Sequence, residues 1–309
     1  MIEWDNRPNP ALPFEKNRDI KIWIDGTLYP REEAKISVLD SVVQGGDAVW
    51  EGLRVYDGRI FHLDAHLNRL FDSAKIMAFE GLPSREQVRD AVIETLKANG
   101  MRDGAHIRLT LTRGKKVTSG MSPHWNQYGC SLIVLAEWKP PVFDKSGLRI
   151  ITSSIRRNGP ETLDSKIHHN NLINNILAKV EANLAGVDEA MMLDPEGYLA
   201  ETNACNVFLV RNGKVLTPHA DFCLPGITRA TVLKLCEIND IPFVERRLSM
   251  AELYTADEAF TTGTMGELTP IVLADGRTIG KTLDTWELLP KLQKLYAELT
   301  ARSGEPLPF

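Results

Sequence analysis

Three polar segments of the chain carry residue types that could do chemistry together. Lys166 lies ahead of an Asn-rich stretch near a predicted domain junction, where a lysine is either an ordinary exposed charge or the Schiff-base partner of a carbonyl cofactor. Glu201 directly precedes a predicted buried strand, so its carboxylate is either a solvated turn residue or the partner of a buried cation. Gly226 and Thr228 open a predicted helix, whose free backbone N–H groups and hydroxyl can bind an anion.

Together the three segments indicate one cofactor. A lysine for an imine, a carboxylate for a pyridinium nitrogen and a helix N-terminus for a phosphate are what pyridoxal phosphate needs from a protein. Other chemistries lose support, because the sequence has no Gly-x-x-x-x-Gly-Lys-Ser/Thr loop, no Gly-x-Gly-x-x-Gly, no His-Glu-x-x-His and no Gly-x-Ser-x-Gly. His168 and His169 are adjacent and cannot share one helix face, so no metal site is predicted.

With these segments in place, the chain resembles the fold-type IV (class IV) pyridoxal-phosphate aminotransferases, and within them the branched-chain-aminotransferase-like proteins. The family also contains D-amino-acid aminotransferase and aminodeoxychorismate lyase. The resemblance runs from about Ile22 to Gly280 and keeps the motifs in family order. The motifs are Val49–Arg54, His66–Leu70, Thr112–Gly114, the segment around Lys166, Glu201–Phe208, Leu224–Arg229 and Thr262–Pro270.

The resemblance implies the fold, the cofactor site and the assembly. The fold would be α+β with two domains, like that of D-amino-acid aminotransferase: a small N-terminal α/β domain and a larger C-terminal mixed α/β domain of barrel-like form. Lys166 would hold pyridoxal 5'-phosphate covalently and later move the proton, and Glu201 would contact the pyridine nitrogen. The residues expected to bind the phosphate are Arg69, Ile227, Thr228 and Thr264. A homodimer is also implied, although no apolar stripe in the sequence stands out as its interface.

The implied reaction is a ping-pong transamination from a branched-chain or other hydrophobic amino acid to a 2-oxo acid. The residues expected to contact the substrate are Trp50, His106, Arg108 and Met265. Branched-chain enzymes bind the α-carboxylate partly through a tyrosine two residues before the arginine, and His106 takes its place here. Two further family tyrosines are replaced by Gly45 and Asn171, so the shape of the pocket is expected to differ.

Three alternatives stay open. A D-amino-acid or (R)-amine transaminase has less support, because the segment after Thr112–Gly114 lacks the Arg-x-His pair that traps the carboxylate in D-amino-acid enzymes. An aminodeoxychorismate lyase would use the same Lys166 and Glu201, so the cofactor motifs do not separate it from a transaminase. A catalytically retired cofactor-binding protein is disfavoured, because Lys166, Glu201 and Arg69 are retained together.

Predicted strands and helices alternate along both halves of the chain. In the first half, strands are expected at 20–24, 49–56, 59–63, 106–112 and 130–136, the last of them buried. Asp64 is expected to cap one helix, and Ser84 with Gln87 forms a capping box for a second. In the second half, strands at 148–152, 189–193, 206–210 and 214–217 alternate with helices that follow the Asn-rich stretch, Pro225-Gly226 and a capping box at Ser249 and Glu252.

A Pro- and Gly-rich segment at 139–147 is predicted to link domains at 1–138 and 148–309. Within the first domain, the strand at 106–112 is expected to have two unlike faces. Ile107, Leu109 and Leu111 point to one side, while His106 and Arg108 point to the other. The polar side is therefore the candidate substrate wall.

The composition bounds the class of protein. The chain has 309 residues, 43% hydrophobic and 25% charged, as in soluble globular proteins. A net charge of −5 argues against a general nucleic-acid binder, and no apolar run approaches the roughly 18 residues of a membrane span. The N-terminus has no secretory signal pattern, and four scattered cysteines without Cys-x-x-Cys are typical of free thiols in a reducing cytoplasm. The expected partners are small-molecule substrates and a second subunit.

Overall fold

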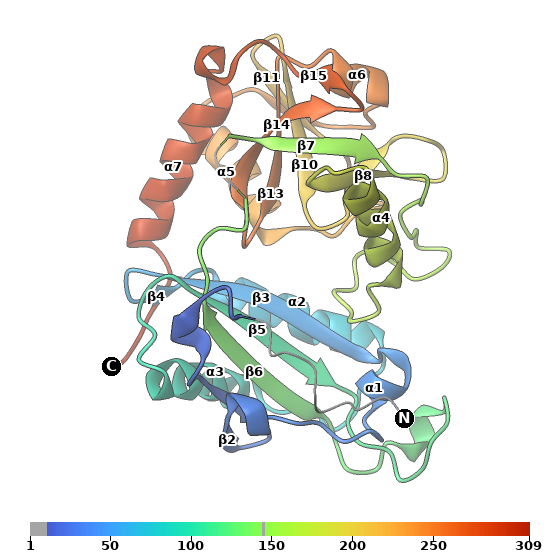
Figure 1. The fold of residues 1–309 in the computed structure, drawn as a ribbon, viewed down its shortest axis with the longest axis vertical. Coiled ribbons are helices and arrows are strands. Elements are labelled where there is room, and N and C mark those ends of the chain that lie inside the picture. Colours follow the sequence, from blue (N-terminus) through green and yellow to red (C-terminus); the bar gives the residue numbers. More distant parts are fainter. Residues whose placement is uncertain (1–10, 144–145) are drawn as a thin grey trace.

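The computed structural model describes residues 11–143 and 146–309, which form two β-sheets with helices packed on each (Figure 1). The described strands up to Trp138 belong to a seven-stranded sheet, and those from Leu148 to Thr278 belong to a nine-stranded sheet. Residues 1–10 of the predicted first domain and residues 144–145 of the predicted linker lie outside the described residues. The mixture of helices and strands predicted for both halves is confirmed.

The first sheet is antiparallel and has the strand order β16-β4-β3-β5-β6-β1-β2. Its strands are β1 (Lys21–Ile24), β2 (Thr27–Pro30), β3 (Ala48–Tyr56), β4 (Arg59–Ile60), β5 (Ala105–Thr112), β6 (Ser131–Trp138) and β16 (Glu305–Pro306). Three helices belong to this half: α1 (Ser41–Gly45), α2 (Leu63–Ile76) and α3 (Arg85–Ala98). Helices α2 and α3 cover one face of the sheet, and the C-terminal strand β16 returns to pair with β4 (Figure 1).

Most local predictions for this half are confirmed, because they rest on neighbours in sequence. Ser84 and Gln87 form the predicted capping box of α3, and the apolar side of β5 is buried as expected. The predicted cap at Asp64 is wrong: α2 begins two residues earlier than that cap implies, at Leu63 after His62 in a left-handed conformation, and Asp64 pairs with Arg89 at 2.6 Å. Because α2 begins at Leu63, the strand predicted at 59–63 is shortened to Arg59–Ile60.

The strand predicted at 130–136 also differs from the structure. Strand β6 begins at Ser131 and ends at Trp138, and its residues alternate between buried and partly exposed positions. It is therefore not buried throughout, because only one of its faces packs against α3 and the core of this half.

The second sheet mixes parallel and antiparallel pairs in the order β12-β11-β10-β13-β14-β7-β8-β9, with β15 paired to β14. Its strands are β7 (Leu148–Thr152), β8 (Glu189–Leu193), β9 (Leu199–Thr202), β10 (Asn206–Arg211), β11 (Lys214–Thr217), β12 (Phe243–Glu245), β13 (Glu258–Gly263), β14 (Glu267–Ala274) and β15 (Arg277–Thr278). Its helices are α4 (Ile173–Leu184), α5 (Ile227–Ile238), α6 (Met250–Tyr254) and α7 (Leu288–Arg302). Short 3-10 turns lie at Glu15–Asn17, Arg31–Glu33, Pro123–Trp125 and Leu283–Thr285.

The four strands predicted in this half before residue 218 are confirmed, as is the capping box of α6 at Ser249 and Glu252. Glu201 corrects one expectation. It does not merely precede a strand but lies within β9, where all four residues are buried. Its carboxylate is thus held inside the structure and is not a solvated turn residue.

Helix α4 carries its large apolar side chains on the outside. Its buried residues are Ala178 and Ala182, which pack against β8. The exposed apolar residues are Ile173, Ile176, Leu177, Val180 and Leu184. This stripe is the apolar surface that the sequence analysis did not single out. In the described part of the chain, no helix is long and apolar enough to cross a membrane.

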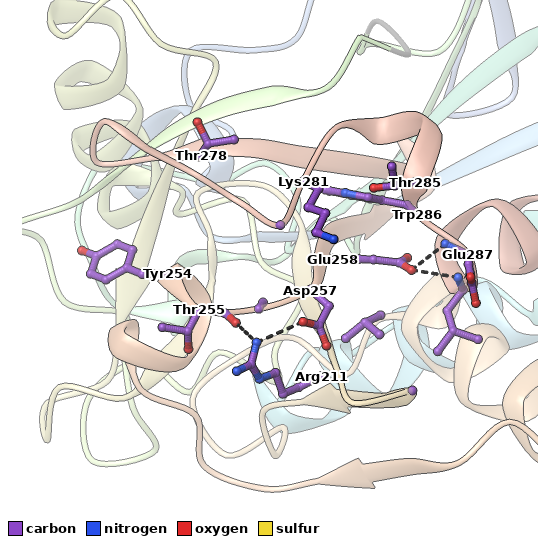
Figure 2. Close-up of a pocket in the computed structure, with 15 residues that line it drawn as sticks. Arg211, Tyr254, Thr255, Asp257, Glu258, Thr278, Lys281, Thr285, Trp286 and Glu287 are labelled. Carbon is purple, nitrogen blue, oxygen red and sulfur yellow. Dashed lines mark hydrogen bonds and ion pairs between the residues drawn. The ribbon is translucent and has the colours of Figure 1, made fainter.

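A surface groove of about 490 Å³ lies at the start of α7 (Figure 2). Its buried carboxylate, Glu258, accepts hydrogen bonds from the backbone N–H groups of Glu287, Leu288 and Leu289 at 2.7, 2.9 and 2.6 Å. The nearby Arg211 is paired with Asp257 at 3.0 Å. Because a helix start carries unpaired N–H groups and positive dipole charge, this carboxylate anchors α7 and is not free for catalysis.

We expect Glu258→Gln to lower the free energy of unfolding by about 1.5–3 kcal/mol, since it removes charge-assisted hydrogen bonds to the first turn of α7. Urea unfolding would measure the change. Glu298→Gln, at an exposed position of the same helix, is the matched control and is expected to leave stability within about 0.5 kcal/mol. Equal unfolding midpoints for the two variants would show that Glu258 does not anchor the helix.

Candidate active site

A cavity of about 310 Å³ opens between the two sheets and is lined by residues from both halves of the chain. It gathers all the site residues predicted from the sequence except the lysine. They are Trp50, Arg69, His106, Arg108, Glu201, Ile227, Thr228, Thr264 and Met265. A second cavity of about 300 Å³ adjoins it and shares Trp50, Arg108 and Glu201 with it.

Lys166 is the predicted residue that does not line either cavity. Its Nζ donates a hydrogen bond to the backbone carbonyl of Asp221 at 3.3 Å and lies 3.8 Å from the carboxylate of Asp164. Its chain neighbours Ser165 and Ile167 do line the second cavity. The lysine segment therefore borders the site, while the lysine side chain, which is 41% exposed, points elsewhere.

One end of the first cavity is suited to an anion. Helix α5 begins at Ile227 without a side-chain cap, so its first backbone N–H groups, including that of Thr228, have no intrahelical partner. Arg69 lies at the same end, where its Nη1 donates to the backbone carbonyl of Pro225 at 3.1 Å. A guanidinium beside an uncapped helix start is a typical binding site for a phosphate.

The sequence analysis missed the carboxylate that holds this arginine. Glu51 is 0% exposed and accepts hydrogen bonds from Nε and Nη2 of Arg69, both at 2.8 Å. The Nδ1 atoms of His66 and His168 lie 2.6 and 3.1 Å from the same carboxylate. Burial alone would raise the pKa of Glu51, but His168 and Arg69 hold it well below its usual range. The only hint in the sequence was the place of Glu51 within the Val49–Arg54 motif.

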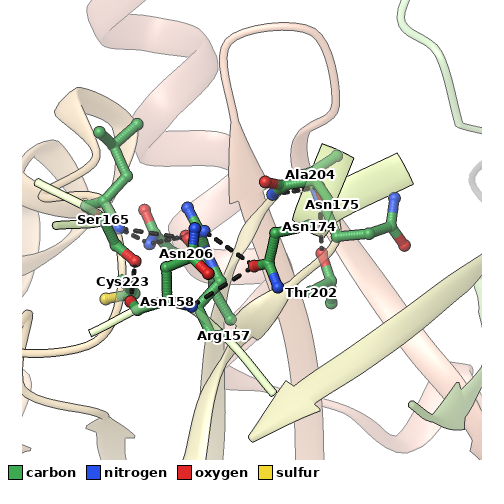
Figure 3. A network of polar contacts seen from close by, with 12 residues as sticks. Arg157, Asn158, Ser165, Asn174, Asn175, Thr202, Ala204, Asn206 and Cys223 are labelled. Carbon is green, nitrogen blue, oxygen red and sulfur yellow. Dashed lines mark hydrogen bonds and ion pairs between the residues drawn. The ribbon is translucent and has the colours of Figure 1, made fainter. Parts of the chain in front are cut away.

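The cavity is also lined by Glu201, whose partners Arg157 and Asn206 belong to a network of polar contacts (Figure 3). Its Oε1 accepts hydrogen bonds from Arg157 Nε at 2.7 Å and from the backbone N–H of Leu224 at 3.3 Å. Its Oε2 accepts one from Asn206 Nδ2 at 3.0 Å. Burial raises the pKa of Glu201, and the guanidinium of Arg157 opposes that rise.

The same network reaches the lysine segment (Figure 3). Arg157 Nη1 donates to Asn174 Oδ1 in the first turn of α4 at 3.2 Å, and the backbone N–H of Asn158 donates to the same oxygen at 3.4 Å. Ser165 then donates its hydroxyl to the backbone carbonyl of Asn158. Ser165, the residue before Lys166, is thereby connected through Asn158 to Arg157, which pairs with Glu201.

The predicted substrate wall is formed by β3 and β5, where Gly52 lies opposite Arg108. The guanidinium of Arg108 stacks 3.3 Å from the ring centre of Trp50. Burial lowers the pKa of Arg108 to about 10, which leaves it charged, and lowers the pKa of His106 to about 3, which leaves it neutral. A side chain at Gly52 would lie 3.2 Å from Nε2 of His106, so the glycine leaves this imidazole open to the cavity.

The sequence profile of class IV amino-transferases matches residues 48–274. The chain belongs to the class IV aminotransferases. It is 58% identical over 302 residues to branched-chain-amino-acid aminotransferase-like protein 2 of Arabidopsis thaliana, covering 97% of this chain and 54% of that protein. The chain thus spans about half the length of the curated relatives it first matches.

Two further similarities span nearly whole chains. The putative branched-chain-amino-acid aminotransferase of Methanocaldococcus jannaschii is 39% identical over 289 residues, which are 92% of this chain and 98% of that one. The solved branched-chain aminotransferase of the archaeon Thermoproteus uzoniensis, determined with norvaline, aligns with a TM-score of 0.84 at 33% identity and covers 91% and 95% of the two chains. The predicted fold-type IV architecture is confirmed by this likeness.

We expect Arg157→Gln to make stability fall as pH rises. Burial holds the pKa of Glu201 above its ordinary value of 4.5, and removing the cation would raise it further. Above pH 4.5, Glu201 loses its proton in the unfolded chain, whereas the folded variant still holds the proton at this buried site. Rising pH therefore favours unfolding. The loss should be about 3–5 kcal/mol at pH 8 and much smaller near pH 4.5. Urea unfolding at both pH values measures it.

The double variant Arg157→Gln with Glu201→Gln is the matched control, because it removes the buried charge together with its partner. Its deficit in unfolding free energy should be nearly the same at the two pH values. If the single variant Arg157→Gln also lost the same unfolding free energy at both pH values, Arg157 would not affect the protonation of Glu201.

Proposed function

We propose that this class IV aminotransferase uses pyridoxal 5'-phosphate to move an amino group from an amino acid to a 2-oxo acid in a ping-pong cycle. The single observation that supports the proposal is the set of polar groups that line one cavity. They are an arginine beside an uncapped helix start and a buried, arginine-paired carboxylate. These groups fit the phosphate and the pyridine nitrogen of the cofactor.

Arg69, the backbone N–H groups of Ile227 and Thr228, and Thr264 would hold the phosphate. Glu201, paired with Arg157, would accept a hydrogen bond from the ring nitrogen. When bound, pyridoxal phosphate would supply an electron sink for bond breaking at the substrate α-carbon. Lys166, whose Nζ donates to the carbonyl of Asp221 in this structure, would hold the cofactor and would carry the α-proton.

Arg108 is proposed to bind the substrate carboxylate. It is charged and half-buried, and within the described residues it forms neither an ion pair nor a hydrogen bond with another side chain. Neutral His106 and the backbone at Thr264 and Met265 complete this wall. Trp50 closes the apolar side, which suits a branched-chain or other hydrophobic amino acid, the substrate class that appears in the names of the relatives.

A half-reaction separates the candidate functions. An L-amino acid such as leucine is mixed with the purified protein and cofactor. It should change the absorbance spectrum of the cofactor and release one equivalent of the 2-oxo acid. Full turnover should then require 2-oxoglutarate or pyruvate in stoichiometric amount. Product formation from aminodeoxychorismate without any 2-oxo acid would support the lyase, and preference for D-leucine or an (R)-amine would support those transaminases. Absence of the absorbance band of covalently held cofactor, even after added cofactor, would support a retired site.

We expect Lys166→Ala to abolish the absorbance band of covalently held cofactor and to lower kcat by at least about a hundredfold, since the variant has neither the link nor the proton carrier. Lys281→Ala, at an exposed position in the groove beside α7, is the control and should keep both properties. Spectra and initial rates of the two variants check the assignment. Near-normal transamination by Lys166→Ala would overturn it.

We further propose a homodimer in a reducing cytoplasm. The exposed apolar stripe of α4 and the four free cysteines support these two parts of the proposal. We expect Leu177→Glu, in the middle of the stripe, to shift the protein toward a monomer by placing a charge in an apolar contact. Ile76→Glu, at an exposed apolar position on α2, is the matched control. Sedimentation velocity would decide, and a fully active wild-type monomer at micromolar concentration would contradict the dimer.

A further inference from the structure

The wall between the two cavities is a stack of three side chains. The guanidinium of Arg108 lies 3.3 Å from the ring centre of Trp50, and the imidazole of His168 lies 4.1 Å from the same indole at a tilt of 38°. All three residues line both cavities. The indole is thus held between a guanidinium and an imidazole, and the stack separates the two spaces.

The imidazole end of the stack is fixed by several contacts. His168 Nδ1 lies 3.1 Å from the buried carboxylate of Glu51, and the backbone N–H of His168 donates to Ser73 Oγ at 3.1 Å. The backbone N–H of Trp50 donates to the carbonyl of His168 at 2.9 Å, and its indole N–H donates to the carbonyl of His169 at 3.1 Å. The segment that follows Lys166 therefore orients both the backbone and the indole of Trp50.

The guanidinium end has no such fixed partners. Within the described residues, the guanidinium of Arg108 has no hydrogen bond or ion pair, and its close contact is the indole of Trp50. An arginine on a flexible side chain keeps a single orientation only if its planar face is held, and stacking on an aromatic ring does this while leaving the N–H edge free. The position of Arg108 then depends on the position of Trp50.

We propose that His168 is a positioning residue for substrate carboxylates: through Trp50 it fixes the guanidinium of Arg108 at the wall of the cavity. The inference rests on the proposed function, in which Arg108 binds the carboxylate. Burial lowers the pKa of His168 to about 4, so near neutral pH the imidazole does not add a second cation behind the indole. The specificity for carboxylate substrates thus extends to a residue that does not contact the carboxylate.

Two substitutions separate the ring of His168 from its hydrogen bond. His168→Phe keeps an aromatic ring against Trp50 and loses the donor to Glu51, whereas His168→Gln keeps a donor and loses the ring. We expect His168→Gln to raise KM for leucine about tenfold with kcat changed less than about threefold, and His168→Phe to stay within about threefold for both. His124→Gln is the control, because His124 is exposed and lines neither cavity.

A binding measurement gives a readout that does not depend on turnover. The dissociation constant of 4-methylvalerate, a leucine-like carboxylate, would be measured on the cofactor-loaded protein by calorimetry, with 4-methylpentanamide as the uncharged reference. We expect His168→Gln to weaken the carboxylate about tenfold and to leave the amide unchanged, and His124→Gln to leave the binding of both unchanged. Circular dichroism of each variant checks that it folds.

Other results would overturn the proposal. If His168→Phe were impaired and His168→Gln were not, the contact with Glu51 and not the stack would matter. If carboxylate and amide weakened equally, His168 would only shape the cavity. A wild-type protein that neither bound 4-methylvalerate nor transaminated any amino acid would instead refute the proposed function. Wild-type activity with an unaffected His168→Gln variant would refute this inference alone.

Discussion

The buried carboxylate of Glu51 is the interaction on which the rest of the site depends. A fully buried charge is stable only when cationic and hydrogen-bonding partners surround it. Its partners come from α2, which supplies His66 and Arg69, and from the segment after Lys166, which supplies His168. Satisfying this one group therefore brings a helix of the first sheet and a loop of the second against β3, and it fixes the arginine at the anion end.

Two separate buried pairs then orient charged side chains that line the cavity. Glu51 orients Arg69 beside the start of α5, and Arg157 orients Glu201. The wall of β3 and β5 adds a charged guanidinium that lacks a counter-ion among the described residues. This distribution of charge is what a cofactor with an anionic tail and a substrate with a carboxylate require, and it agrees with membership of the class IV aminotransferases.

The sequence predicted those parts of the fold and site that depend on neighbours in the chain. The capping box at Ser84 and the uncapped start of α5 after Gly226 are local patterns, and both lie where expected. The role of Glu51 was not predictable, because its partners lie 15 to 117 residues away. The outward apolar stripe of α4 was missed for a related reason: a 3.6-residue period shows that one face is apolar but not which face packs on the sheet.

The most direct test of the central claim is the effect of Glu51→Gln on the binding of pyridoxal phosphate. Its dissociation constant would be measured, together with that of 4-methylvalerate on the loaded protein, with Glu258→Gln as a remote carboxylate control. If Glu51 orients Arg69, pyridoxal phosphate should bind at least about tenfold more weakly to Glu51→Gln and normally to the control, while 4-methylvalerate should change by less than about threefold. Wild-type affinity of Glu51→Gln for pyridoxal phosphate would contradict the claim that this carboxylate organises the site.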